Sequence, residues 1–197
     1  MSPTFRTERL LLRPWRDSDR EPFAAMNADP EVMRHFQGTR TATESGEFID
    51  RIAAHWAEHG WGLFALEVVD TDTAPGVPFI GFTGLWPADY VQQGMVEVGW
   101  RLARSAWGHG YAPEAARESL RFGFEDVGLN EIVSFTVPQN TNSQRVMQKI
   151  GLRRDPSGDF DHPGVNREKY PELEHHVFYR LPRDEWEAAK RLSEREG

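Results

Sequence analysis

The chain has 197 residues and contains no cysteine. This absence excludes disulfide bonds, thiolate metal sites and a cysteine nucleophile, because each of them needs a thiol group. The chain also lacks any apolar run approaching the roughly 20 residues that a membrane-spanning helix needs. Its first residues lack the apolar core of a signal peptide. We therefore expect a cytoplasmic protein.

Positive charge is scarce as well. The 23 Lys and Arg residues face 31 Asp and Glu residues, which gives a formal net charge of −8. This balance argues against general nucleic-acid binding, because phosphate contacts rely on clustered Lys and Arg. It favours a cationic partner such as a protonated amine. The content of 39% hydrophobic and 27% charged residues is typical of a globular protein, and the length predicts a single domain over residues 1–197.

Hydrophobic periodicity and turn residues predict a mixed α/β chain. The predicted strands cover residues 8–14, 61–69, 78–86, 95–102, 131–137 and 176–181, with a hairpin connection over 70–76 and a polar loop over 155–172. The predicted helices start at Asp17 or Ser18, at Pro30 (carrying Phe36), at the Thr41–Glu44 capping box, at Tyr111 (ending at Gly128), at Asn140 and at Asp184. Because strand 131–137 is reached through a helix, we expect it to run parallel to strand 95–102.

The turn Gly108-His109-Gly110 separates a predicted strand from a predicted helix. Glycine adopts positive φ and lets the backbone approach a ligand, and the first N–H groups of a helix have no intrahelical partner. Together with the helix dipole, those donors favour an anionic group such as a pyrophosphate. The same residues also suit a tight turn that binds nothing, because a lone G-x-G is a weak signal.

Several segments resemble the GNAT N-acetyltransferases, and more narrowly their Rim-type branch, named for acetylation of ribosomal-protein N-termini. These segments are Thr7–Pro14, Asp29–Met33, Glu97–Trp100, Trp107–Ala115, Asn140–Val146 and Lys149–Leu152. They occur in the right order through nearly the whole chain. The resemblance implies an α/β (α+β) fold with a mixed, mostly antiparallel central sheet, a splayed pair of parallel strands and flanking helices. It also implies acetyl-CoA as cosubstrate in the gap between those strands, and no metal.

The resemblance assigns residues to the cofactor site. The pyrophosphate loop is matched by Gly108, His109, Gly110, Tyr111 and Ala112. The strand edge along which pantetheine lies is matched by Trp100, Arg101 and Leu102. Asn140 matches the asparagine that contacts the pantetheine arm. One position departs from the superfamily pattern. Ser105 stands where Gln or Arg often begins the loop.

Amine acetylation requires an amine that loses its proton close to the thioester. Glu97 is the first candidate base, because it lies on the strand that enters the turn and burial there would raise its pKa. A structural glutamate on a sheet surface explains the residue equally well. His162 and His35 are rival bases, since imidazole titrates near neutral pH.

The transfer releases the thiolate of CoA, and a free thiol has a pKa of about 8.5. A nearby hydroxyl can help this thiolate to leave by donating a proton to it. Ser143 matches the serine of an N-x-x-S motif in the Rim-type branch, for which this role has been proposed. The alternative interpretation makes Ser143 a helix-capping serine. A backbone amide at the splayed strand would hold the oxyanion.

The leading hypothesis is an acetyl-CoA-dependent N-acetyltransferase that moves an acetyl group to a primary amine by direct transfer in a ternary complex. A non-catalytic acyl-CoA-binding module is the alternative. A dinucleotide-binding protein fits poorly, because Pro113 occupies the position where that fingerprint needs a small residue. The sequence leaves open whether the acceptor is a protein N-terminus or a small molecule, and whether the protein forms a homodimer.

Overall fold

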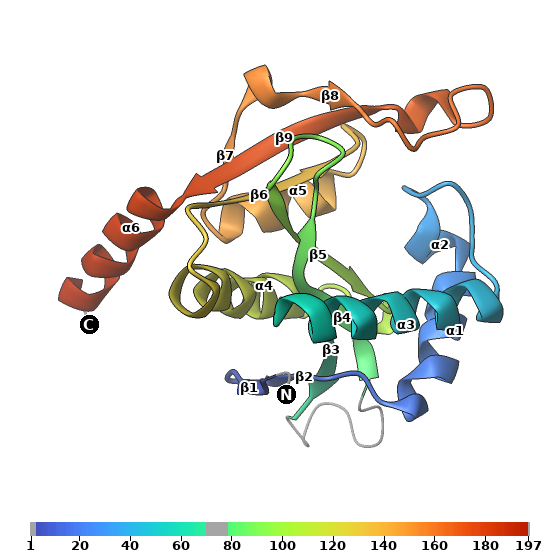
Figure 1. The fold of residues 1–197 in the computed structure, drawn as a ribbon, viewed down its shortest axis with the longest axis horizontal. Coiled ribbons are helices and arrows are strands. Elements are labelled where there is room, and N and C mark those ends of the chain that lie inside the picture. The colour runs from blue at the N-terminus through green and yellow to red at the C-terminus, as the bar shows by residue number, and fades with distance from the viewer. Residues whose placement is uncertain (1–2, 70–78, 197) are drawn as a thin grey trace. The chain divides into compact units, whose positions relative to one another are not determined.

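The computed structural model describes residues 3–69 and 79–196, so the predicted hairpin connection over 70–76 lies outside the described residues. The chain forms two compact units, and Figure 1 labels their helices and strands. The first unit comprises Met1–Trp86 and Gly99–Ser119, and the second comprises Pro87–Val98 and Leu120–Gly197. The single domain expected from the length stays a prediction, and we describe each unit by itself.

The strands of the first unit form an antiparallel meander. They are β1 (Phe5–Arg6), β2 (Leu10–Arg13), β3 (Leu63–Val68), β4 (Phe79–Pro87) and the second half of β5 (Val96–Leu102). Antiparallel pairing joins β1 to β2, β2 to β3 and β3 to β4. The predicted strands are confirmed, whereas the two-residue β1 is too short to show a periodic pattern.

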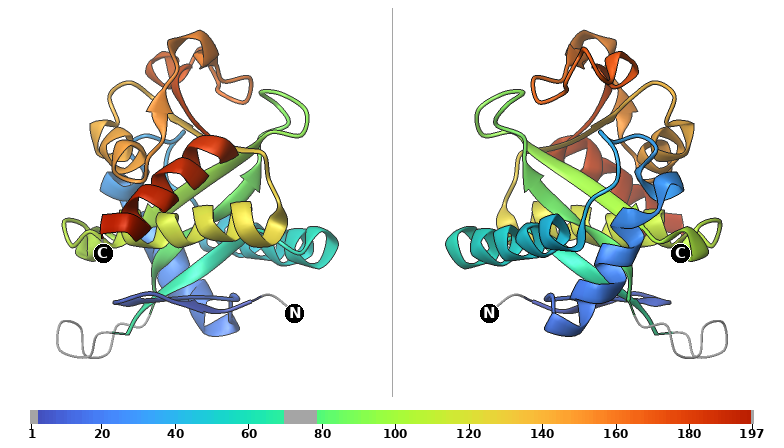
Figure 2. Two further views of the ribbon diagram at one scale, coloured as in Figure 1. Left: turned by 90° about the vertical axis from the view of Figure 1, so that its left-hand side faces the viewer. Right: turned by 90° about the vertical axis from the view of Figure 1, so that its right-hand side faces the viewer.

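The helices of the first unit are α1 (Arg20–Ala28), α2 (Pro30–Met33) and α3 (Ala42–His59). The predicted capping box is confirmed: the Thr41 hydroxyl accepts from the Glu44 N–H at 3.2 Å, and the Glu44 carboxylate accepts from the Thr41 N–H at 2.7 Å. Figure 2 shows α3 as one uninterrupted helix. The expectation that Phe36 lies on a helix is wrong, because α2 ends at Met33.

Aromatic side chains fix α1 to the sheet of the first unit. Phe23 on α1 is fully buried, and its ring centroid lies 5.0 Å from Trp15 and 6.0 Å from Phe82. Burying a side chain of this size contributes about 1.5–3 kcal/mol. Because Asn27 lies on the same helix, these contacts also hold Asn27, which is fully buried, in place.

The second unit is built around β6 (Glu131–Thr136) and β9 (His175–Pro182), which pair antiparallel over the full length of β6. The parallel pairing predicted for β6 is confirmed by the register Glu97↔Val133 with β5. The sheet is thus mostly antiparallel with one parallel pair, as the resemblance implies. The prediction of a polar loop over 155–172 is only partly correct, because this segment contains the short strand β8 (Phe160–Asp161), which pairs with β9.

The predicted continuous helix from Tyr111 to Gly128 is only partly correct. The α-helix α4 covers Tyr111–Arg121, and a π-helical segment follows over Phe122–Val127. Phe122 and Phe124 are both buried in this segment. Gly128 ends the segment with φ of 84°, as expected of a C-terminal glycine.

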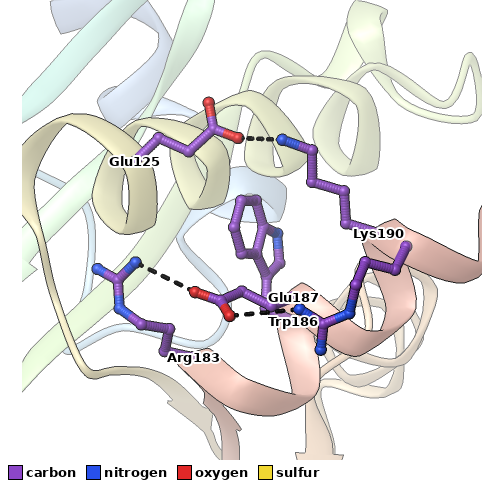
Figure 3. Close-up of a pocket in the computed structure, with 6 residues that line it drawn as sticks. Glu125, Arg183, Trp186, Glu187 and Lys190 are labelled. Atoms are coloured by element: carbon purple, nitrogen blue, oxygen red, sulfur yellow. Dashed lines mark hydrogen bonds and ion pairs between the residues drawn. The ribbon is translucent and has the colours of Figure 1, made fainter. Parts of the chain in front are cut away.

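The remaining helices of the second unit are α5 (Thr141–Lys149) and α6 (Arg183–Glu196). Trp186 of α6 stacks on Phe124 at 5.0 Å between ring centroids. Figure 3 shows Trp186 between two groups of ion pairs, in which Glu125 binds Lys190 at 2.5 Å and Glu187 binds Arg183 and Arg191. These residues line a shallow pocket. Because their charges are already paired with one another, we interpret the pocket as part of the contact that holds α6 in the second unit.

Among the helices of the described ranges, none combines the length and apolar character needed to cross a membrane.

Candidate functional site

The glycine turn of the first unit has the backbone that the sequence predicts. Gly108 and Gly110 both have φ of 80°, a conformation that L side chains rarely adopt. A Cβ built on Gly108 would meet nothing within 4 Å, and one built on Gly110 would meet only Arg9 Nη2 at 3.5 Å. The space above the turn is therefore open to a ligand.

The backbone donors of this turn point to an anion. In the part of the chain that the structure describes, the N–H groups of residues 108–112 have no acceptor, and the first helical bond of α4 runs from Glu114 N to Gly110 O at 3.3 Å. Unpaired amides at the positive end of a helix dipole suit a phosphate group. The residues present thus fit the pyrophosphate of acetyl-CoA.

Arg9 holds this turn in place. Its Nη1 donates to the His109 carbonyl at 2.9 Å, and its Nε donates to Glu114 Oε2 at 2.8 Å. Glu114 also accepts from the Thr7 hydroxyl at 2.6 Å. Burial opposes ionisation of Glu114, but the hydrogen bonds from Thr7 and Arg9 hold its pKa below the ordinary value. Sequence reasoning missed this clamp.

The predicted pantetheine edge lies on β5. The Ala103 N–H donates to Ile80 O on β4 at 2.9 Å, so by alternation Arg101 also turns its backbone groups to β4, whereas Trp100 and Leu102 turn theirs to the opposite edge. The Leu102 carbonyl there accepts from Trp107 Nε1 at 2.9 Å. This geometry favours the Trp100 backbone as the contact for an extended ligand.

Glu97 lies in the second unit, on the part of β5 that pairs with β6. Its residue surface is only half-buried, but its carboxyl lies among many protein atoms, and this burial raises its pKa from 4.5 to about 8. A carboxyl with such a pKa gains and loses its proton near physiological pH. The raised pKa is compatible with the role of a base, which for Glu97 stays a prediction beside that of a structural glutamate on a sheet surface.

Tyr90 is a neighbour of Glu97 that sequence reasoning missed. Burial, followed by the negative charge of Glu97, raises the pKa of Tyr90. Its ring lies 4.7 Å from that of His162 and 6.1 Å from that of Phe135, measured between centroids. The only sequence signal for Tyr90 is its position in the turn before β5. Many tyrosines lie in turns, so this position does not single it out as a functional residue.

Asn140 and Ser143 meet at the start of α5 in the second unit. Asn140 Oδ1 accepts from the Ser143 N–H at 3.2 Å, and Asn140 Nδ2 donates to Thr136 Oγ1 at 3.0 Å. Asn140 is therefore the N-cap, and the interpretation of Ser143 as the capping side chain is wrong. The Ser143 hydroxyl has no partner among the described residues, so it is available for another role.

The two rival bases are placed differently. Burial lowers the pKa of His162, whose Nδ1 accepts from the Gly164 N–H at 3.0 Å. Burial and the charge of Arg34 lower the pKa of His35, which belongs to the first unit. A lowered pKa keeps both rings neutral at pH 7 but makes them weaker bases. His162 lies near Tyr90 and stays the stronger rival.

Residues 9–153 match the family described as Acetyltransferase (GNAT) domain. The FsC-acetyl coenzyme A-N(2)-transacetylase of Aspergillus fumigatus is 32% identical over 197 residues, covering 93% of this chain and 78% of that protein. A crystal structure of an acetyltransferase from Agrobacterium tumefaciens has a TM-score of 0.72 and 27% identity, covering 92% of this chain and 95% of that one. The structure of a ribosomal-protein-S5-alanine acetyltransferase from Vibrio fischeri has the same fold, with a TM-score of 0.66, 17% identity and coverage of 94% and 99%.

The family match covers most of the chain, and the fold is shared over more than nine-tenths of it. Both agree with the motifs around the glycine turn and α5. The chain therefore belongs to the GNAT acetyltransferase family.

Proposed function

We propose that this protein is an acetyl-CoA-dependent N-acetyltransferase that acts on a primary amine by direct transfer. The observation that carries the proposal is the run of amides over residues 108–112, for which the described part of the chain offers no acceptor and which fits the pyrophosphate of CoA. Arg9 and Glu114 keep those amides in position. The cofactor supplies an acetyl group activated as a thioester.

The chain contributes a base and an acid to the transfer. Glu97 removes the proton from the acceptor amine, because its raised pKa makes it basic enough at neutral to mildly alkaline pH. The amine nitrogen forms the new bond to the acetyl carbon, and the bond from carbon to sulfur breaks. The nitrogen loses its second excess proton to solvent as the amide forms. The Ser143 hydroxyl donates a proton to the departing thiolate and recovers one from solvent, to which Glu97 releases the proton that it took from the amine.

The alternative is a module that binds acyl-CoA without turnover. The raised pKa of Glu97 argues against it, because burying a carboxyl costs stability, and a binding module gains nothing from that cost.

Acetyl-CoA consumption by the purified protein tests the proposal. We expect release of the free CoA thiol with at least one of four amine classes: peptide N-termini, polyamines, aminoglycosides and amino acids. Mass spectrometry of the acceptor should show the acetyl adduct, and a reaction without amine controls for hydrolysis of the thioester. Binding of acetyl-CoA without consumption in all four classes would support the non-catalytic module.

Ser143→Ala is expected to lower kcat by about ten- to a hundredfold while the KM for acetyl-CoA changes little, since protonation of the leaving group occurs in the transition state. Stability should change by less than about 0.5 kcal/mol, because the hydroxyl has no partner among the described residues. The matched control is Thr141→Ala on the same helical turn, which should keep the wild-type rate. Lost stability with an unchanged rate would make Ser143 a structural residue.

A further inference from the structure

The side chain of Arg101 lies in the interior of the first unit, with only 9% of the residue exposed. Its Nη1 donates to Asn27 Oδ1 at 2.7 Å. Asn27 is fully buried, and its Nδ2 donates to the Ser45 hydroxyl at 3.0 Å. The guanidinium is therefore held by the side-chain amide of Asn27, which is held in turn by the Ser45 hydroxyl.

The charge of Arg101 lacks a counterion in the described part of the chain. A comparison with Arg13, the other buried arginine there, makes this clear, because Arg13 binds Asp19 at 2.7 Å and Glu67 at 2.6 Å. Arg101 has no carboxylate partner, and its buried Nε has no hydrogen-bond acceptor. Burial and the positive charge of Arg40 lower the pKa of Arg101 to about 9, which still leaves it charged at neutral pH.

Aromatic contacts compensate this buried charge only in part. The guanidinium carbon lies 4.1 Å from the centre of the Phe36 ring and 5.5 Å from that of Phe82. Such contacts offset only part of the desolvation cost of an unpaired buried charge. Phe36 is 39% exposed, so the guanidinium lies beneath a ring that reaches the surface.

We propose that Arg101 determines acceptor specificity by binding a carboxylate of the amine substrate, so that the substrates are amino acids or other amines that carry a carboxylate. The proposal rests on the proposed function for the reaction itself. The fork of the guanidinium matches a carboxylate in two parallel hydrogen bonds. The proposed partners of the CoA pyrophosphate are the amides of residues 108–112, and the pantetheine and acetyl parts carry no charge. A carboxylate on the acceptor would supply the counterion that Arg101 lacks.

Binding of product-like ligands tests this proposal without turnover. The probes are N-acetylglycine, N-acetylalanine, N-acetylphenylalanine and N-acetylglutamate, each as the free acid and as the α-carboxamide, titrated into the full chain by calorimetry. For at least one pair we expect the wild-type protein to bind the acid about ten- to a hundredfold more tightly, the range of a charged hydrogen bond. Equal binding of acid and amide in every pair would overturn the proposal.

Variants separate recognition from packing. Arg101→Met should abolish the preference for the acid, and Arg101→Lys should keep only part of it, because lysine lacks the fork. The surface variant Arg51→Met is the matched control and should keep the full preference. The melting temperature of Arg101→Met should fall only slightly, because the variant removes an unpaired buried charge but leaves Oδ1 of the buried Asn27 without its donor. A large fall in that temperature, with no acid preference in the wild type, would make Arg101 structural.

Failure of the proposed function would look different. In that case acetyl-CoA would fail to bind the wild-type protein, whatever the comparison of acids with amides shows. Arg101→Met should retain acetyl-CoA binding, because the amides of the glycine turn are unchanged. Loss of acetyl-CoA binding in Arg101→Met would assign the guanidinium to the cofactor and contradict its role in acceptor recognition.

Discussion

Glu97→Gln is expected to lower kcat by about a hundredfold or more, the usual contribution of a positioned general base. The change keeps the shape of the side chain and much of its hydrogen bonding but removes the basic oxygen. Glu131→Gln is the matched control, because Glu131 lies on the neighbouring strand β6 in a partly buried ion pair with Arg180. We expect that variant to keep a rate within about twofold of the wild type, since the proposed reaction gives Glu131 no role.

The pH dependence identifies the base. Because burial raises the pKa of Glu97 to about 8, the wild-type rate should rise with pH along a limb centred near that value, as Glu97 loses its proton. In Glu97→Gln this limb should disappear together with most of the rate. If both the limb and the rate survive, the proton leaves through water or through His162, and Glu97 is not the base.

Stability gives an independent readout of the same residue. The pKa of Glu97 is higher in the folded chain than its ordinary value of 4.5, so the folded state binds more protons than the unfolded state between about pH 4.5 and 8. The stability contributed by protonated Glu97 is therefore complete below about pH 4.5 and is lost as the pH rises through about 8. Glu97→Gln should reduce this loss, which thermal unfolding at pH 5 and pH 9 would measure.

Gly110→Val is expected to weaken acetyl-CoA binding by about a hundredfold, which corresponds to one or two charge-assisted hydrogen bonds. The methyl groups of valine would occupy the open space above the amides of residues 108–112. Positive φ at a branched residue also strains the backbone by about 1–3 kcal/mol.

The matched control for this strain is Gly128→Val. Gly128 has φ of 84° and open space around its Cβ position, and it ends the π-helical segment of the second unit. The two variants should lose similar stability, but only Gly110→Val should lose acetyl-CoA binding. Normal binding by Gly110→Val would reduce the glycine turn to a structural connection.

The features that the sequence predicted well are local. The capping box at Thr41, the positive φ of Gly108 and Gly110, and the parallel partner of β5 each follow from a few adjacent residues or from chain connectivity. Glycine and capping residues have strong local conformational preferences that tertiary contacts seldom override. These features place the glycine turn correctly at the start of α4.

The features that the sequence did not predict depend on distant residues. Arg9 and Glu114 are 105 positions apart, and Asn27 and Arg101 are 74 positions apart. No periodicity reveals such pairs, because only the folded backbone brings them into contact. For the same reason the sequence alone does not reveal the burial of the Glu97 carboxyl, which raises the pKa of that group. The cytoplasmic location and a homodimer stay predictions.

Thermal unfolding of the wild-type protein with acetyl-CoA, compared with NAD, tests the central claim most directly. A ligand that binds only the folded state stabilises it by about 2.7 kcal/mol at a hundredfold excess over Kd. For a chain of this length, that raises the melting temperature by about 5–10 °C. We expect this shift with millimolar acetyl-CoA and none with NAD. No shift with acetyl-CoA, or an equal shift with NAD, would contradict the assignment of the glycine turn to CoA.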